Sequence, residues 1–167
     1  WALPIDAATQ VKAHRADLTS RVPSWSDVIR KAENGHVIWA LRSPHVLMSF
    51  YTLAANLGRP CATSHGDLVD TQTGLQVFEQ LSAVAQHMDE AFYSMDPIAV
   101  LDELAESDRY HLSPLVYLYK GYANDGYRAN RISFTDMPVL GRNGPLGSAL
   151  GGTGIAISSK TAHPVSY

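Results

Sequence analysis

Short apolar runs along this chain predict strands, and longer stretches with apolar residues at helical spacing predict helices. The runs that predict strands lie at residues 3–10, 36–41, 110–119, 131–134 and within 148–158. Because Pro4 removes a backbone donor, we expect the first run to form an edge or linking strand. Pro114 is expected to break or end the third run.

Capping residues mark where most of the predicted helices begin. A brief helix is expected at residues 11–18, and Ser24 or Ser26 caps a second that ends near residue 32. Ser43 and Pro44 have the N-cap and N1 signature of a third. The longest helix opens at Thr71 or Thr73, and a last one opens at Asp96-Pro97. Strands that alternate with helices predict a three-layer α/β domain.

The composition narrows the class of protein. A chain of 167 residues fits one domain, and its charged fraction of 17% is below the roughly 25% of ordinary soluble domains. With 13 Lys and Arg against 16 Asp and Glu and no long basic run, nucleic-acid binding is excluded. A single cysteine, Cys61, excludes an internal disulfide. The sequence has no membrane-spanning apolar stretch and no signal peptide, so we expect no membrane insertion.

Two places carry residues suited to ligand binding. Arg42, Ser43 and His45 lie at a strand-to-helix junction, where free helix N–H groups face outward; an ordinary capped helix is the alternative. Tyrosines 117, 119, 122 and 127 surround a loop, and flat rings with a hydroxyl stack on sugars; packing of these rings in the core is the alternative. The seven histidines show no ligand spacing, so no metal site and no cofactor are predicted. The missing GxSxG and HExxH signatures favour a binding module over an enzyme.

Several runs, in a consistent order, resemble extracellular solute-binding proteins of bacterial ABC importers. They are LPIDAATQ at 3–10, RADL at 15–18, VPSWSDV at 22–28 and LGGTGIAIS at 150–158. Two more, LMSFYTLAAN at 47–56 and MDPIAVL at 95–101, are similar to one subgroup of that family. The resemblance extends over nearly the whole chain. It implies the type 2 periplasmic-binding-protein fold, here as a three-layer αβα lobe with a mixed sheet.

Such proteins clamp their ligand between two α/β lobes joined by crossing strands. In that scheme residues 1–10 and 148–158 are hinge crossings, and residues 1–167 are the second lobe alone. Both ends of the chain read as interior parts of elements, so we expect it to be part of something longer. By resemblance, this lobe's ligand-binding residues are Asp6, Thr9, Gln10, Ser43, His45, Ser49, Ser113, Tyr117, Tyr119, Tyr122, Gly151 and Gly152.

The resemblance implies a non-enzymatic, periplasmic or other extracytoplasmic protein. It would bind a small polar solute and deliver it to a membrane permease, and the tyrosine-rich loop favours a carbohydrate. Three alternatives stay open: an effector-binding domain of a cytoplasmic transcription regulator, an enzyme on a similar α/β lobe, and an isolated lobe without a function of its own. The sequence leaves the identity of the ligand open.

Overall fold

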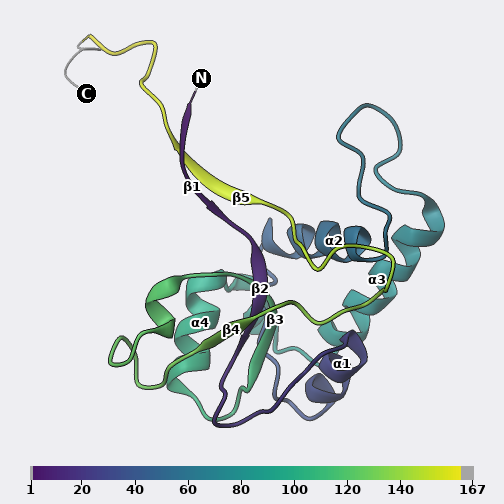
Figure 1. Cartoon of the computed structure of the whole chain (residues 1–167), viewed down its shortest axis with the longest axis vertical. Coiled ribbons are helices and arrows are strands. Elements are labelled where there is room, and N and C mark those ends of the chain that lie inside the picture. Colours follow the sequence, from purple (N-terminus) through teal and green to yellow (C-terminus); the bar gives the residue numbers. More distant parts are fainter. Residues whose placement is uncertain (1, 163–167) are drawn as a thin grey trace.

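The computed structural model describes residues 2–162 and folds them into a globular body from which a two-stranded ribbon projects (Figure 1). Its strands are β1 (Leu3–Ala8), β2 (Gln10–His14), β3 (Leu112–Tyr117), β4 (Ser133–Thr135) and β5 (Gly151–Ile155). Its α-helices are α1 (Trp25–Glu33), α2 (His45–Asn56), α3 (Thr71–Ala85) and α4 (Pro97–Glu106), with 3-10 turns η1 (Glu90–Ser94) and η2 (Lys120–Ala123). Within the described residues, no helix combines the length and apolar character that crossing a membrane requires.

The strands form two small antiparallel sheets. In the body the order is β3-β2-β4, and β1 pairs only with β5 in the ribbon. Parallel neighbours are limited to two isolated bridges, Val37 with Leu112 and Ser24 with Val139. The α/β fold is therefore confirmed, whereas the expected three-layer mixed sheet is replaced by these two smaller antiparallel sheets.

The helix predicted at residues 11–18 is wrong, because β2 occupies Gln10–His14 as the central strand of the body sheet. Ala13 is fully buried there, between β3 and β4. Pairing on both edges satisfies the backbone donors and acceptors of this short segment, which outweighs its weak local preference for a helix. The chain thus runs almost straight from the ribbon through Thr9 into the middle of the sheet.

Two further predictions about strands need correction. Residues 37–41 are buried as expected, but they form only an isolated parallel bridge with β3, at Val37, and no regular strand. Pro114 does not break β3: it lies inside the strand, where Pro114 and Leu115 together stand opposite Lys12 in a bulge. A bulge leaves one residue without its ladder hydrogen bond, so a proline without an N–H fits there.

Two of the four α-helices in the described residues, α1 and α4, have the N-cap that the sequence predicts. Ser24 and Asp27 form a reciprocal capping box at α1. Asp96 accepts hydrogen bonds from two backbone N–H groups at the start of α4. Ser43 is not the cap expected for α2, because Pro44 holds the N-cap position and gives no side-chain hydrogen bond. Helix α3 begins at Thr71, one of the two predicted starts, and its N-cap is Asp70.

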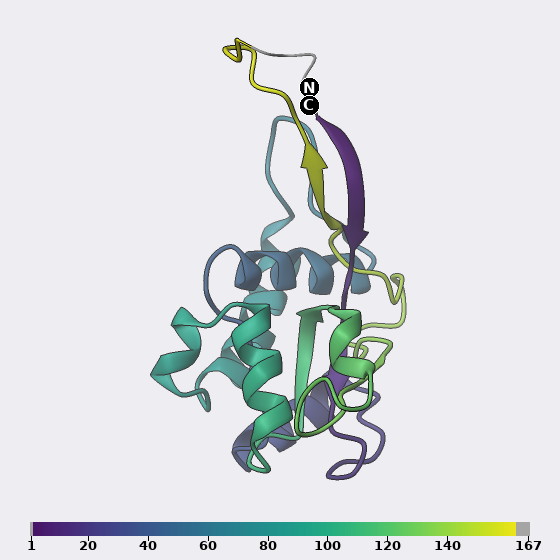
Figure 2. The ribbon, with the colours of Figure 1, turned by 90° about the vertical axis from the view of Figure 1, so that its left-hand side faces the viewer.

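The core lies between the body sheet and the helices. Helix α4 packs against β3, while α3 packs against both α1 and α2. Two tryptophans anchor the centre: the rings of Trp25 and Trp39 meet edge to face with centroids 5.7 Å apart. Each indole N–H donates to a backbone carbonyl, Trp25 to Gln80 and Trp39 to Leu115, both at 3.1 Å. These contacts hold α1, α3 and β3 in place, and Figure 2 shows the ribbon rising away from this packed body.

Candidate functional site

A cavity of about 600 Å³ lies where the β1–β5 ribbon joins the body. Its walls come from both ribbon strands, the start of α2, the start of α4, and the end of β3 with the residues after it. Segments far apart in the sequence therefore converge here. The lining residues are Asp6, Ala7, Ala8, Pro44, His45, Met48, Pro97, Tyr117, Leu118, Tyr119, Lys120, Leu150, Gly151, Gly152 and Thr153.

The starts of two helices border this cavity, but they differ in how their free N–H groups are satisfied. At α4, the carboxylate of Asp96 accepts from the N–H groups of Ile98 and Ala99 at 3.0 Å. At α2, Pro44 supplies no side-chain acceptor. The first turn of α2 therefore has no side-chain cap for its free N–H groups, and it brings the positive end of the helix dipole to the cavity wall.

His45 is the first residue of α2 and lies partly buried in the cavity wall. Burial of the imidazole, opposed by Asp96 and reinforced by Arg42, lowers the pKa of His45. Its Nδ1 atom is buried and has no hydrogen-bond partner among the described residues. A neutral imidazole can donate or accept, so His45 is suited to binding a hydroxyl group of a ligand.

The aromatic wall of the cavity consists of one fixed ring and one exposed ring. Tyr117 contacts His45 edge to face with centroids 6.3 Å apart, and its hydroxyl donates to the carbonyl of Ala149 at 3.3 Å. Burial raises the pKa of Tyr117. Tyr119 is 43% exposed, and the apolar side chain of Leu150 is exposed close by in the same wall. Tyr119 can therefore stack on a flat, apolar face of a ligand.

Two glycines of β5 let the backbone come close to this wall. A Cβ atom at Gly151 would lie 2.9 Å from the ring of Tyr117, and one at Gly152 would lie 2.6 Å from the carbonyl oxygen of Asp6. The Asp6 carboxylate accepts a hydrogen bond from the backbone N–H of Thr153 at 2.7 Å. Larger residues at either glycine would push the ribbon away from the cavity.

Six of the twelve residues predicted for the site line this cavity, and six do not. The lining residues are Asp6, His45, Tyr117, Tyr119, Gly151 and Gly152. Thr9 and Ser43 are exposed and lie outside the lining. Gln10 and Ser49 are buried outside the lining, where the Gln10 amide donates to Ser49 at 3.1 Å and accepts from Thr52 at 2.7 Å. These hydrogen bonds join β2 to α2.

Ser113 and Tyr122 lie in the interior, apart from the cavity. Ser113 is fully buried in β3, and the hydroxyl of Tyr122 donates to Asp102 of α4 at 2.7 Å. Tyr122 therefore links η2 to α4. For this tyrosine the structure agrees with packing in the core, the alternative to ligand binding. Sequence reasoning missed the cavity residues Pro97 and Lys120. The start of the helix at Asp96-Pro97 was a usable signal for Pro97, whereas nothing local marked Lys120.

The sequence matches no protein-family model and no curated protein, but the fold matches solved structures. One is an ABC transporter solute-binding protein from Thermotoga lettingae bound with alpha-D-tagatose. Its structure matches with a TM-score of 0.77 at 13% sequence identity, over 98% of this chain and 47% of that chain. The chain shares the fold of part of ABC transporter solute-binding proteins. A second such protein, from Agrobacterium vitis with bound D-mannitol, gives a TM-score of 0.66 at 13% identity over 98% of this chain and 44% of that chain.

A third match is a protein connected with xylan utilization in Caldanaerobius polysaccharolyticus, with a TM-score of 0.61 at 13% identity over 98% of this chain and 47% of that chain. In all three comparisons this chain spans less than half the length of the matched chain. The structural similarity therefore extends over the elements of this chain, including the ribbon, and at 13% identity it shows the fold alone.

Proposed function

We propose that this chain is the second lobe of a non-enzymatic, extracytoplasmic solute-binding protein that delivers its ligand to the permease of an ABC importer. The observation that carries the proposal is the cavity at the base of the ribbon. It combines an exposed aromatic ring, a histidine whose Nδ1 has no hydrogen-bond partner among the described residues, and the start of α2 without a side-chain cap, in a fold shared with solute-binding proteins. In this scheme β1 and β5 are the hinge strands, and a first lobe closes over the cavity.

We propose a carbohydrate or polyol as the ligand. Tyr119 offers a flat face to the C–H side of a sugar ring, while His45 and the first turn of α2 offer hydrogen bonds to its hydroxyl groups. The two ligands named for the matched structures, alpha-D-tagatose and D-mannitol, are a sugar and a sugar alcohol. Both have the mixture of C–H and hydroxyl surface that such a wall accommodates.

Half of a clamp should bind weakly. A closed pocket buries about 70–90% of a small ligand. If a complete clamp binds at about micromolar Kd, or about −8 kcal/mol, one wall with half of the contacts gives about −4 kcal/mol, which is a Kd of about 1 mM. We therefore expect the 167-residue chain alone to bind sugars in the millimolar range.

Titration of the isotope-labelled chain with D-mannitol and with D-tagatose, followed by two-dimensional NMR, tests this proposal. We expect saturable amide shifts at Ala7, Gly151 and Tyr119, and Tyr119→Ala should weaken binding several-fold. Tyr93→Ala is the matched control, because Tyr93 is 55% exposed and lies outside the cavity. No cavity-localised shift with either ligand at high millimolar concentration would contradict the site. A micromolar Kd for this chain alone would contradict the half-site argument.

A further inference from the structure

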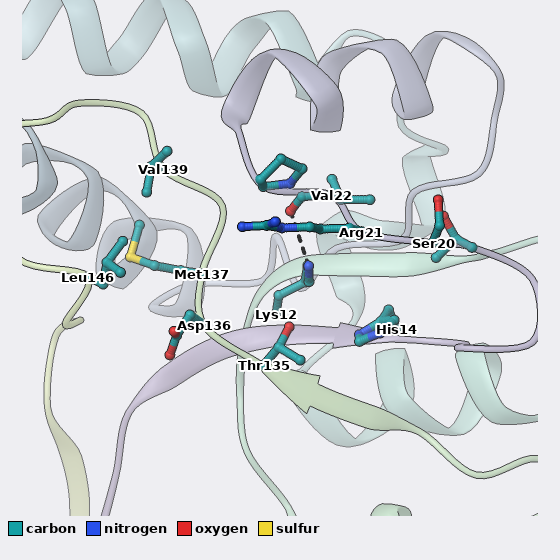
Figure 3. Close-up of a pocket in the computed structure, with 12 residues that line it drawn as sticks. Lys12, His14, Ser20, Arg21, Val22, Thr135, Asp136, Met137, Val139 and Leu146 are labelled. Atoms are coloured by element: carbon teal, nitrogen blue, oxygen red, sulfur yellow. Dashed lines mark hydrogen bonds between the residues drawn. The ribbon is translucent and has the colours of Figure 1, made fainter.

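A second cavity, of about 490 Å³, lies on the body and shares no lining residue with the first. Figure 3 shows it between β2, the connection that precedes α1, and the segment that follows β4. Its residues are Lys12, His14, Thr19, Ser20, Arg21, Val22, Pro23, Thr135, Asp136, Met137, Val139 and Leu146. Basic and hydroxyl side chains line it together with one carboxylate, that of Asp136, and apolar side chains form the rest of the wall.

Lys12 is a buried cation without a carboxylate partner. It extends from the central strand β2, is only 5% exposed, and donates from Nζ to the carbonyl oxygen of Val22 at 3.1 Å (Figure 3). Among the ion pairs of residues 2–162, none involves Lys12 or Arg21. Burial, reinforced by Arg21 and opposed by Asp136, lowers the pKa of Lys12. A lysine this deeply buried is normally paired with an anion.

Two neutral side chains in the same wall each have a buried polar atom without a hydrogen-bond partner among the described residues. Thr19 is 6% exposed, and its Oγ1 atom has no hydrogen-bond partner among the described residues. The Nδ1 atom of His14 is also buried and has no hydrogen-bond partner among these residues. Both residues line the cavity beside Lys12. Buried polar atoms are usually hydrogen-bonded, so these two atoms in one cavity, next to a cation without an ion pair, point to a missing hydrogen-bonding group.

We propose that this cavity binds an oxyanion of the phosphate class. Lys12 and Arg21 supply the positive charge, while the Thr19 hydroxyl and the His14 imidazole supply hydrogen bonds from other directions. Donors spread over several directions suit a tetrahedral group with several acceptor oxygens. The proposal stands independently of the sugar site, because the two cavities share no residue.

The size and lining of the cavity suit a phosphorylated small molecule as well as free phosphate. A volume of about 490 Å³ exceeds what a single phosphate group fills. The apolar side chains of Met137, Val139 and Leu146 line the remaining space. A phosphorylated small molecule could place its phosphate at Lys12 and its carbon body against this wall, whereas free phosphate would use the basic side alone.

Thermal unfolding of the 167-residue chain in inorganic phosphate, with sodium chloride at matched ionic strength as reference, tests the proposal. Phosphate should raise the Tm of the wild type in a saturable way, because a ligand that binds the folded state stabilises it. Lys12→Met should abolish this rise, and Arg21→Gln should weaken phosphate binding about tenfold, as expected for one charge-assisted contact. Arg59→Gln, a change at another exposed arginine outside the cavity, should leave the rise unchanged.

Each remaining outcome is decisive. A Tm rise of equal size in the wild type and in Arg21→Gln would overturn the proposal, even if Lys12→Met fails to fold. An equal rise with acetate would also overturn it, and so would binding of an acidic peptide without any effect of phosphate. Glucose 1-phosphate distinguishes a phosphorylated small molecule from free phosphate as the ligand. If it binds more tightly than inorganic phosphate, the site is assigned to an organic phosphate, and if it binds more weakly, the site is assigned to the free ion.

Discussion

Replacing Asn56 with alanine should release the segment that carries the chain from the body into the ribbon. Asn56 is fully buried at the last turn of α2. Its Oδ1 accepts from the N–H groups of Leu140 and Gly141 at 2.7 and 2.9 Å, and its Nδ2 donates to the carbonyl of Pro145 at 3.0 Å. A Cβ atom at Gly144 would overlap the carbonyl oxygen of Ala55, so this segment sits directly against the end of the helix.

The expected cost follows from these three hydrogen bonds. Each contributes about 1 kcal/mol net, so Asn56→Ala should lower the free energy of unfolding by about 3 kcal/mol. This is a large share of the roughly 5–15 kcal/mol that stabilises a typical domain. With an m-value of about 2 kcal/mol per molar, the midpoint of urea unfolding should fall by about 1.5 M.

Urea unfolding followed by tryptophan fluorescence measures this change. Asn124→Ala is the matched control, because Asn124 is exposed in a loop, and it should shift the free energy of unfolding by less than about 0.5 kcal/mol. A loss below about 1 kcal/mol in Asn56→Ala would refute the assignment of Asn56 as the anchor of this segment. An equal loss in the two variants would refute it as well.

Two further predictions concern pH and the interior tyrosine. Burial is the largest cause of the lowered pKa values of His14, His45 and His111. Below about pH 6.5 the unfolded chain therefore binds more protons than the folded one, and the free energy of unfolding should fall as the pH drops. Urea titrations between about pH 7.5 and about pH 5 measure this change, and a free energy of unfolding that stays constant over this range would contradict the prediction. Tyr122→Phe removes the hydrogen bond to Asp102 and should lower the free energy of unfolding by about 1 kcal/mol. Its sugar-induced NMR shifts should stay as in the wild type, and their loss would place Tyr122 in the site after all.

Local signals in the sequence predicted the helices well wherever the cap belongs to the helix itself. Ser24 with Asp27, and Asp96 with Pro97, satisfy backbone groups within a few residues, so no distant contact is needed to define those starts. The segment 11–18 shows the opposite case. Its state depends on β3 and β4, which are about a hundred residues further along the chain, and no periodicity within the segment reveals those partners.

The candidate site divides in the same way. The sequence indicated residue types suited to a polar ligand, and six of the twelve named residues line the cavity. Alternation along β2 and β3 could not show that the polar side chains of Gln10 and Ser113 are buried. It also could not show that Lys12, in the middle of the central strand, lacks an ion pair within the described part of the chain. Pairing and burial of this kind are properties of the packed chain.

The sequence by itself therefore determined the α/β class, the starts of the capped helices and the kind of chemistry the surface offers. Each of these depends on composition or on residues a few positions apart. The tertiary structure alone decided that β1 and β5 pair into a projecting ribbon, that β2 is central, and that two separate cavities form. Those features require contacts between distant segments, whose free energy comes from burial and hydrogen bonding that exist only after the chain has folded.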